Sequence, residues 1–195
     1  GFNVLATDGV YVGGDLLNSD IFYKKLGPLF GTQNTWGEKS LNMPYNIITA
    51  LQSWYGIPNL NTPETIGFLE GNAQHNSSNP EAIDRLLHLI HKNLGFEIYE
   101  AIESAKKELT TKEESMITFS DGPININEMI TRSEFEAIIS PRVESVRNCV
   151  IRTLKKAGVE PEDISVVVRT GGSSLIPIYE QMLNDLFGKE RVKEF

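Results

Sequence analysis

A double-glycine turn near the C-terminal end of the chain places the strongest constraint on its fold. Residues 163–169 read as a buried strand, Gly171-Gly172 follow it, and an apolar helix pattern begins near Pro177. Glycine permits positive φ and lets a ligand approach the bare backbone, while free N–H groups at a helix start favour oxygen-rich, negative ligands. The pattern predicts an α/β connection with the geometry of a nucleotide site; an ordinary strand-to-helix turn is the alternative.

A second glycine pair near the N-terminus repeats this arrangement. Residues 3–7 and 10–15 read as two strands, the second of which enters Gly13-Gly14. Asp15 can then cap a helix. We therefore expect one ligand held from two sides, which requires the two glycine turns to lie close together.

Apolar residues recur every three or four positions between residues 83 and 109, which predicts one amphipathic helix. Asn79 can cap this helix, and Gly95 bends it without ending it. Glycine and proline breaks predict short helices over residues 21–79. A small sheet is expected around residues 116–119 and 124–126.

A second long helix is predicted from Thr131, because Thr131 and Glu134 form a capping-box pattern. Pro141 kinks this helix and Gly158 ends it. A strand and the glycine turn follow, so the end of the chain is expected to close an α/β core.

Four polar side chains share one face of the first long helix, beside its apolar stripe. From the spacing alone, a solvated face is favoured, with an i,i+4 ion pair of about 0.2–0.5 kcal/mol between Glu103 and Lys107. The alternative is the edge of a ligand groove. The four residues are Glu103, Lys106, Lys107 and Thr110.

Charge and hydropathy exclude two classes of partner. The chain has 18 Lys and Arg against 26 Asp and Glu, a formal net charge of -8, which opposes a surface that neutralises nucleic-acid phosphates. No run of residues is long and apolar enough to span a membrane, and no leader precedes the first strand. We expect a cytoplasmic protein that contacts neither nucleic acid nor membrane.

Histidine and aromatic residues give no independent evidence of a site. Metal binding needs more ligands than the histidines and the single cysteine, Cys149, supply at suitable spacing, so no metal-binding residue is predicted. Aromatic residues of short helices usually pack inward, so Trp36, Trp54 and Tyr55 are expected in the core or at an interface within the domain. The histidines are His75, His88 and His91.

Four segments occur in an order that matches a known family: residues 4–15, 103–110, 130–136 and 171–177. Together they resemble the second lobe of the ATPase domain of seventy-kilodalton heat-shock chaperones, the DnaK-like branch of the actin-like ATPases. Residues 21–79 match no family in this way. The resemblance implies an actin-like, ribonuclease-H-like α/β lobe II with an enlarged, mainly helical subdomain.

The same resemblance implies two subdomains. An α/β core subdomain would comprise residues 1–14 plus 135–195. A mainly helical inserted subdomain with a small sheet would comprise residues 15–134.

The resemblance further implies a site for ATP or ADP with Mg²⁺, the metal being held mainly by parts of the protein outside this chain. Glycine and serine residues of the two turns would present backbone and hydroxyl groups, and the helix would approach ribose and base. No catalytic residue is predicted. Two positions that usually hold arginine in the family hold Leu175 and Lys107 here. The predicted nucleotide-binding residues are Gly13, Gly14, Glu103, Lys106, Lys107, Thr110, Gly171, Gly172 and Ser173.

For function, the resemblance implies a full-length ATPase that couples its ATP state to lobe closure and to binding of protein clients or cochaperones. The chain by itself is expected to be inactive, because it lacks a glycine-rich phosphate loop and a lysine-bearing first lobe. One alternative is another actin-like ATPase, such as a filament protein or a reactivating factor. A second is a protein-interaction module that has lost useful nucleotide binding.

Overall fold

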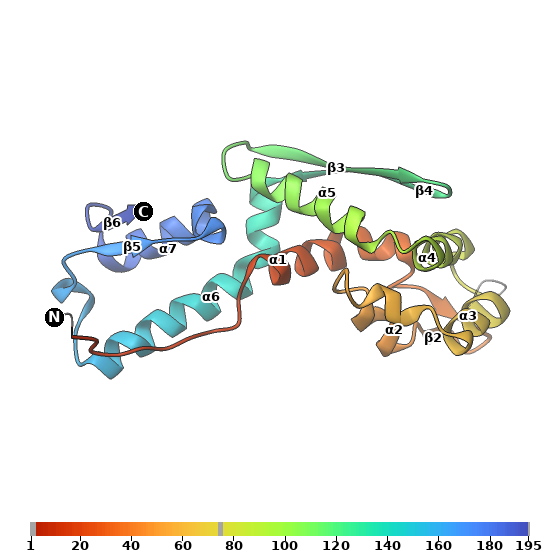
Figure 1. Ribbon diagram of the computed structural model, residues 1–195, viewed down its shortest axis with the longest axis horizontal. Helices are drawn as coiled ribbons and strands as arrows, with labels where there is room; N and C mark the ends of the chain where they lie inside the picture. The colour runs from red at the N-terminus through yellow and green to blue at the C-terminus, as the bar shows by residue number, and fades with distance from the viewer. Residues whose placement is uncertain (1–2, 74–75, 195) are drawn as a thin grey trace. The chain divides into compact units, whose positions relative to one another are not determined.

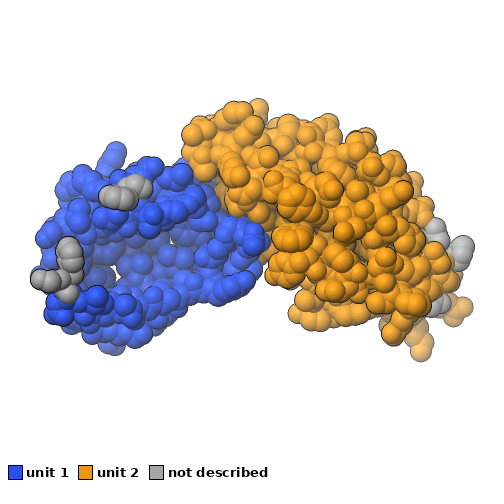
Figure 2. Space-filling model, viewed as in Figure 1, with its two compact units in different colours: residues 1–17, 136–195 blue, residues 18–135 orange. Residues whose placement is uncertain are grey.

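The computed structural model describes residues 3–73 and 76–194. These residues form two compact units, one of residues 1–17 with 136–195 and one of residues 18–135 (Figure 2). The boundaries fall within α1 (Gly14–Ile21) and near the start of α6 (Arg132–Ala157). The subdomain limits expected from the sequence stay a prediction.

The unit of residues 1–17 and 136–195 contains a parallel strand pair joined by a helix. β5 (Val167–Arg169) leads through α7 (Pro177–Phe187) to β6 (Val192–Glu194) (Figure 1). The two strands are parallel, with Val167 opposite Val192 and Arg169 opposite Glu194. A parallel pair needs a crossover, and α7 provides it. The strand expected over residues 163–169 forms only over its last three residues, Val167–Arg169. Its first expected residue, Asp163, belongs instead to a 3₁₀ turn, Pro161–Asp163.

The N-terminal segment, residues 3–13, contains neither of the strands predicted there. A strand exists only where neighbouring backbone satisfies its N–H and C=O groups. Here Val12 N–H donates to the Val10 carbonyl, and Val4 and Leu5 are largely exposed. The prediction was wrong because residue alternation reports β propensity and not the presence of a partner strand.

Asp8 connects this N-terminal segment to α6. Its Oδ2 accepts hydrogen bonds from Lys156 Nζ at 3.0 Å and Arg152 Nε at 3.2 Å. The hydrogen bond from Lys156 is the main cause that lowers the pKa of Asp8 to about 2, and the Gly9 N–H adds to it. The carboxylate thus stays ionised at neutral pH and keeps both contacts.

α6 begins and ends where the sequence predicts. The Thr131 hydroxyl accepts the Glu134 N–H at 3.2 Å, while the Glu134 carboxylate binds Lys25 and does not complete a capping box. Pro141 deprives the Ala137 carbonyl of its helical donor, and the Ser140 hydroxyl donates to that carbonyl at 3.1 Å. The helix ends before Gly158, whose φ is +70°.

Where the structure describes it, the unit of residues 18–135 consists of short helices, two long helices and two hairpins. Short helices do form over the part of residues 21–79 that the structure describes. They are a π turn (Phe22–Leu26), 3₁₀ turns (Gly27–Phe30 and Ile57–Leu60), α2 (Tyr45–Ala50), α3 (Pro63–Phe68) and a second π turn (Leu69–Ala73). The small hairpin pairs β1 (Thr35–Trp36) with β2 (Leu41–Asn42).

The long helix predicted over residues 79–109 is two helices, α4 (Pro80–Lys92) and α5 (Gly95–Glu108). Asn79 caps α4 as predicted, its side chain accepting the Ala82 N–H at 3.2 Å. The break lies at Asn93, whose left-handed φ of 54° ends α4 before Gly95 is reached. Gly95 is required for packing, because a Cβ there would lie 2.8 Å from Ile57 Cδ1.

The large hairpin pairs β3 (Glu114–Asp121) with β4 (Ile124–Thr131) in antiparallel register, and both strands expected in this region are present. Ile117, Ile126 and Ile130 are buried on one face, while Met116 and Met129 are exposed on the other. This alternation is what a sheet covered on a single side requires.

Aromatic residues only partly follow the expectation of inward packing. Trp36 is half-buried and packs edge-on against Phe68, with ring centroids 5.0 Å apart. Trp54 and Tyr55 are 43% and 59% exposed, so a place in the core is wrong for both. The other predicted place for these two residues, at an interface within the domain, stays a prediction. Each lies in a turn after α2 whose inward positions are taken by Leu51 and Ile57.

The hairpin tip contacts α4 at one histidine. His88 Nε2 lies 2.5 Å from Asp121 Oδ1, and Gly122 has a φ of +53°. A Cβ at Gly122 would lie 2.6 Å from His88 Cε1, closer than real Cβ contacts come.

We expect Gly122→Ala to destabilise this unit by about 1–3 kcal/mol, through left-handed strain and the clash with His88. Chemical denaturation followed by tryptophan fluorescence measures this, because Trp36 and Trp54 both lie in residues 18–135. Gly67→Ala is the matched control: it lies in α3, where a Cβ meets nothing within 4 Å, so stability should hold or rise. Equal stability of the two variants would contradict the prediction.

Candidate functional site

The C-terminal glycine turn leaves backbone donors unused. Gly171 has φ 87° and ψ 150°, and a 3₁₀ turn follows over Gly172–Leu175. The turn's own hydrogen bonds begin with Ser174 N–H, which donates to the Gly171 carbonyl at 3.0 Å. The N–H groups of Gly172 and Ser173 are therefore not used inside the turn.

Packing does not explain why the glycines are there. A Cβ at Gly171, Gly172 or Gly13 would meet no atom of the described residues within 4 Å. Of these three, only Gly171 has a positive φ that itself favours glycine. Glycine at these positions leaves the backbone uncovered by side-chain atoms, so that a ligand could reach it.

The N-terminal glycine pair opens α1, although not as predicted. The Gly13 carbonyl accepts the N–H groups of Leu16 and Leu17 at 3.1 and 3.2 Å. Asp15 lies in the first turn of α1, so its predicted role as the cap was wrong. Its carboxylate still lies where the helix dipole favours negative charge.

Both glycine turns belong to the unit of residues 1–17 and 136–195. Val12, next to the first turn, and Ser173, in the second, line one cavity of about 450 Å³, which valines of α6 and β5 and side chains of α7 also line. Direct proximity of Gly14 and Gly172 stays a prediction. Both turns therefore lie beside the same cavity within this unit.

Glu103 is the centre of the polar cluster on α5. Its Oε2 accepts a hydrogen bond from Asn18 Nδ2 at 2.9 Å and contacts Lys106 Nζ at 2.5 Å. Burial alone would raise the pKa of Glu103, but the hydrogen bonds from Lys106 and Asn18 and the charges of Lys106 and Lys107 hold it below the usual value of 4.5. Glu103 is therefore an ionised, fixed acceptor.

The other three residues of this cluster differ in exposure. Lys106 is 6% exposed, which a solvated helix face does not predict. Lys107 is 72% exposed and lies 3.5 Å from Glu103 Oε1, the i,i+4 pair that the spacing indicates. The Thr110 hydroxyl donates to the Lys107 carbonyl at 2.7 Å, at the C-terminal end of α5.

The predicted site residues thus form two groups in two units. Gly13, Gly14 and residues 171–173 lie in one unit, and residues 103–110 in the other. Each group brings together the chemistry expected of it: bare backbone and a hydroxyl in the first, a carboxylate with two ammonium groups in the second. The predicted common site formed by both groups stays a prediction.

Two residues of these groups were missed from the sequence. Asn18 precedes Glu103 by 85 positions, so no local pattern connects them. Arg169 is 7% exposed at the end of β5, and its Nη1 donates to the Ser174 carbonyl at 2.5 Å. The sequence does contain one signal for Arg169, because a charged residue directly follows the three valines of residues 166–168.

Leu175 and Lys107, which replace the arginines usual in the resembled family, are both exposed. Neither side chain has a planar group that can stack on a base. Among the described residues, no group of three or more His, Cys, Asp or Glu could hold a metal ion. His75 lies outside those residues.

Comparison with known proteins identifies the relatives of this chain. The family model "Hsp70 protein" matches residues 89–195. Chaperone protein DnaK of Trichormus variabilis is 39% identical over 99 residues, which cover 48% of this chain and 14% of that protein. Chaperone protein DnaK of Thermus thermophilus is 34% identical over 101 residues, which cover 48% of this chain and 16% of that protein.

These matches cover only a small part of the relatives, because the aligned segment is 14–16% of their length. The family-model match contains α5 and the Gly171 turn but not the Gly13 turn. Within the described ranges, no helix has both the length and the hydropathy that a membrane crossing requires.

We expect Glu103→Gln to lower stability by about 1–3 kcal/mol at neutral pH, because buried Lys106 loses its carboxylate partner. The folded pKa of Glu103 lies below the usual value of 4.5, so its contribution is present above that pH and is lost as pH falls through the folded pKa. The difference between wild type and variant, measured by denaturation from pH 7 downwards, should shrink accordingly. Glu81→Gln is the control, since Glu81 is highly exposed and lies 3.7 Å from Arg85, so the stability of this variant should differ little from that of wild type.

Proposed function

The chain belongs to the Hsp70 family, and from this premise we propose that it supplies the second lobe of an actin-like ATPase domain, which clamps an adenine nucleotide. Hsp70 membership implies the actin-like ATPase fold, and the described helices and strands are of mixed α and β type. One observation carries the proposal. The turn at Gly171 and the cluster on α5 both lie within the segment that matches the family, and each has the chemistry to hold part of a nucleotide.

The glycine turn fits a phosphate group. Phosphate oxygens accept N–H donors, and the Gly172 and Ser173 N–H groups are unused within their turn. The missing Cβ atoms leave room for an anion to reach this backbone. The Ser173 hydroxyl adds a donor that can rotate to suit the oxygen it meets.

The α5 cluster fits the ribose and base. The ionised Glu103 carboxylate, fixed by Asn18 and Lys106, can accept hydrogen bonds from ribose hydroxyls. Lys107 extends an exposed ammonium group beside it. None of the proposed site residues is assigned to Mg²⁺, which other parts of the protein would hold; the bound nucleotide with Mg²⁺ supplies the phosphoryl chemistry.

Coupling follows if the nucleotide is shared between this lobe and the first lobe of the full-length ATPase domain. Such a nucleotide binds most tightly when the two lobes adopt one relative arrangement, so nucleotide state would bias lobe closure. In the full-length protein this bias would reach a protein client or cochaperone. The proposed subdomains are residues 1–14 plus 135–195 and residues 15–134.

We expect Gly172→Trp to reduce ATP affinity at least about 100-fold, because the indole fills the space proposed for phosphate. Lys106→Ala should reduce it about tenfold, because Glu103 loses the contact that fixes its carboxylate. Calorimetry on the folded full-length protein measures both.

The matched controls are Gly9→Trp and Lys112→Ala. Gly9 lies in the same unit as Gly172, and a Cβ there would likewise meet no atom within 4 Å; Lys112 is an exposed lysine just beyond α5. Both controls should bind ATP as wild type does. Wild-type affinity in both site variants would reject the residue assignment.

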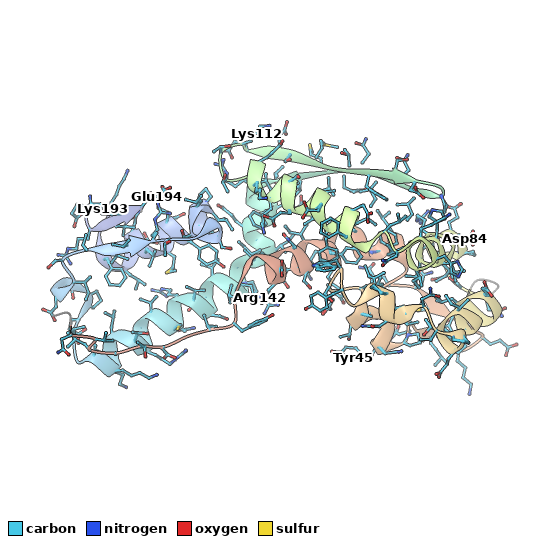
Figure 3. All side chains as sticks on the ribbon, viewed as in Figure 1. Tyr45, Asp84, Lys112, Arg142, Lys193 and Glu194 are labelled. Atoms are coloured by element: carbon cyan, nitrogen blue, oxygen red, sulfur yellow. The ribbon has the colours of Figure 1, made fainter. Side chains whose placement is uncertain are left out.

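A second candidate function is binding of a protein partner by a surface around Trp54 and Tyr55, which lie outside the segment that matches the family model. An exposed aromatic cluster favours it. Trp54 contacts Tyr55 and Phe96 edge-on, with ring centroids 5.7 and 5.8 Å apart. All three rings are more than two-fifths exposed, and nearby α2 carries Tyr45, 81% exposed and pointing outward (Figure 3). Exposed aromatic groups are the residues that most often anchor protein interfaces.

We expect the double substitution Trp54→Ser with Tyr55→Ser to weaken partner binding at least about tenfold while ATP affinity stays unchanged. Pull-down with the full-length protein and calorimetry measure the two properties. Point changes are preferred to deletion of this region, because Ile47, Leu51 and Ile57 belong to the core. Met116→Ser, an equally exposed apolar residue on β3, is the control. Retention of every partner by the double variant would reject this function.

A further inference from the structure

We propose that Arg169 is a positioning residue that holds the Gly171–Leu175 turn in the shape in which its N–H groups receive a negatively charged ligand. Arg169 need not touch that ligand. The identity of the ligand as an adenine nucleotide rests on the proposed function, whereas the restraint of the turn by Arg169 does not.

One guanidinium group connects three elements of its unit. Arg169 Nη1 donates to the Ser174 carbonyl in the turn, and Nη2 donates to Glu180 Oε2 on α7 at 3.1 Å. Nη2 also lies 3.8 Å from Oε2 of Glu194, the residue opposite it on β6 (labelled in Figure 3). The turn is thereby tied to the helix that follows it and to the strand beside it.

Ser174 transmits this restraint to Gly171. Its N–H and its hydroxyl both donate to the Gly171 carbonyl, at 3.0 and 2.6 Å. Its own carbonyl receives Arg169. The peptide groups on both sides of Gly172 and Ser173 are thus fixed, and so are the directions of the two unused N–H groups between them.

The geometry requires arginine and not merely a positive charge. A guanidinium is planar and presents several donors in a fixed fork, so it can bond a carbonyl and a carboxylate at once in fixed directions. A lysine ammonium is a single flexible donor centre. It can keep one of the two contacts with less directional control.

The surroundings of Arg169 argue against a role in stability alone. The side chain is 6% exposed, and its Nε has no hydrogen-bond partner among the described residues. Burying a guanidinium with an unfilled donor is costly, and replacing buried ionic groups by apolar ones is often neutral or stabilising. Glu180 and Glu194 are 44% and 61% exposed, so removal of Arg169 would leave no buried, unpaired charge.

The test measures the turn and the ligand separately in the full-length protein. Arg169→Met keeps a long side chain but removes every donor. We expect the N–H groups of Ser174 and Ile176, which are hydrogen-bonded to the Gly171 and Ser173 carbonyls, to exchange with solvent about fivefold faster or more. ATP should bind about tenfold more weakly, with little change in melting temperature. Arg169→Lys should give a smaller loss of affinity than Arg169→Met.

The matched control is Arg191→Met. Arg191 belongs to the same unit and donates from Nη1 to the carbonyls of Pro161 and Glu162, at 3.1 and 3.2 Å, in a different turn. The Arg191→Met variant should accelerate exchange of backbone N–H groups near residues 161–164. Exchange in the Gly171 turn and ATP affinity should stay unchanged. If Arg169→Met fails to fold, Glu180→Gln serves instead, because it weakens the anchor of Arg169 at a half-exposed position.

The outcomes separate the two proposals. Unchanged exchange of the Ser174 and Ile176 N–H groups in Arg169→Met, or in Glu180→Gln where that variant replaces it, overturns the restraint. Faster exchange with unchanged ATP affinity overturns the role in ligand binding, provided that Gly172→Trp abolishes binding. If Gly172→Trp binds ATP normally, the turn is not part of the ATP site, and the exchange measurement alone decides whether Arg169 holds the turn. If Lys106→Ala also binds ATP normally, the residue assignment of the proposed function fails.

Discussion

Phe22 packs between Phe30 and Tyr99, and the arrangement of the unit of residues 18–135 depends on this stack. The ring centroids lie 5.8 and 5.4 Å apart, all three rings are buried, and Tyr99 Oη donates to the Leu51 carbonyl at 2.8 Å. Asn18 lies one helical turn before Phe22, and Glu103 lies one turn after Tyr99. The stack therefore brings Asn18 and Glu103 into register, and their hydrogen bond fixes the carboxylate of the candidate site.

Local chemistry made some of this structure predictable. Asn79 and Thr131 cap helices through their side chains, and Gly158 ends α6 in a left-handed conformation. Each of these roles depends on a few neighbouring residues. Asn93 ends α4 in the same left-handed conformation. The apolar residues keep their spacing of three and four on both sides of Asn93, so the sequence pattern did not indicate a break between two helices there.

Features that depend on distant partners were not predictable in this way. The N-terminal alternation suggests strands, yet strand formation requires a neighbouring backbone that the pattern does not specify. The burial of Lys106 depends on Glu103 and on packing against elements far away in the chain. For the same reason, the glycine turn could be predicted from Gly171 and Gly172, whereas its restraint by Arg169 required the fold of α7 and β6.

The exposed Lys107 and Leu175 change how the proposed site would distribute its binding energy. An arginine can stack its planar group on a base, but an ammonium acts as a point charge and a leucine offers apolar contact alone. The glycine turn and the Glu103 carboxylate would then supply a larger share of the affinity for the proposed nucleotide. Their directions must be fixed before the ligand arrives, because a flexible turn would lose binding energy to its own ordering. In the proposed site, weak recognition of the base would thus increase the importance of the contacts that hold Ser174 and Glu103 in place.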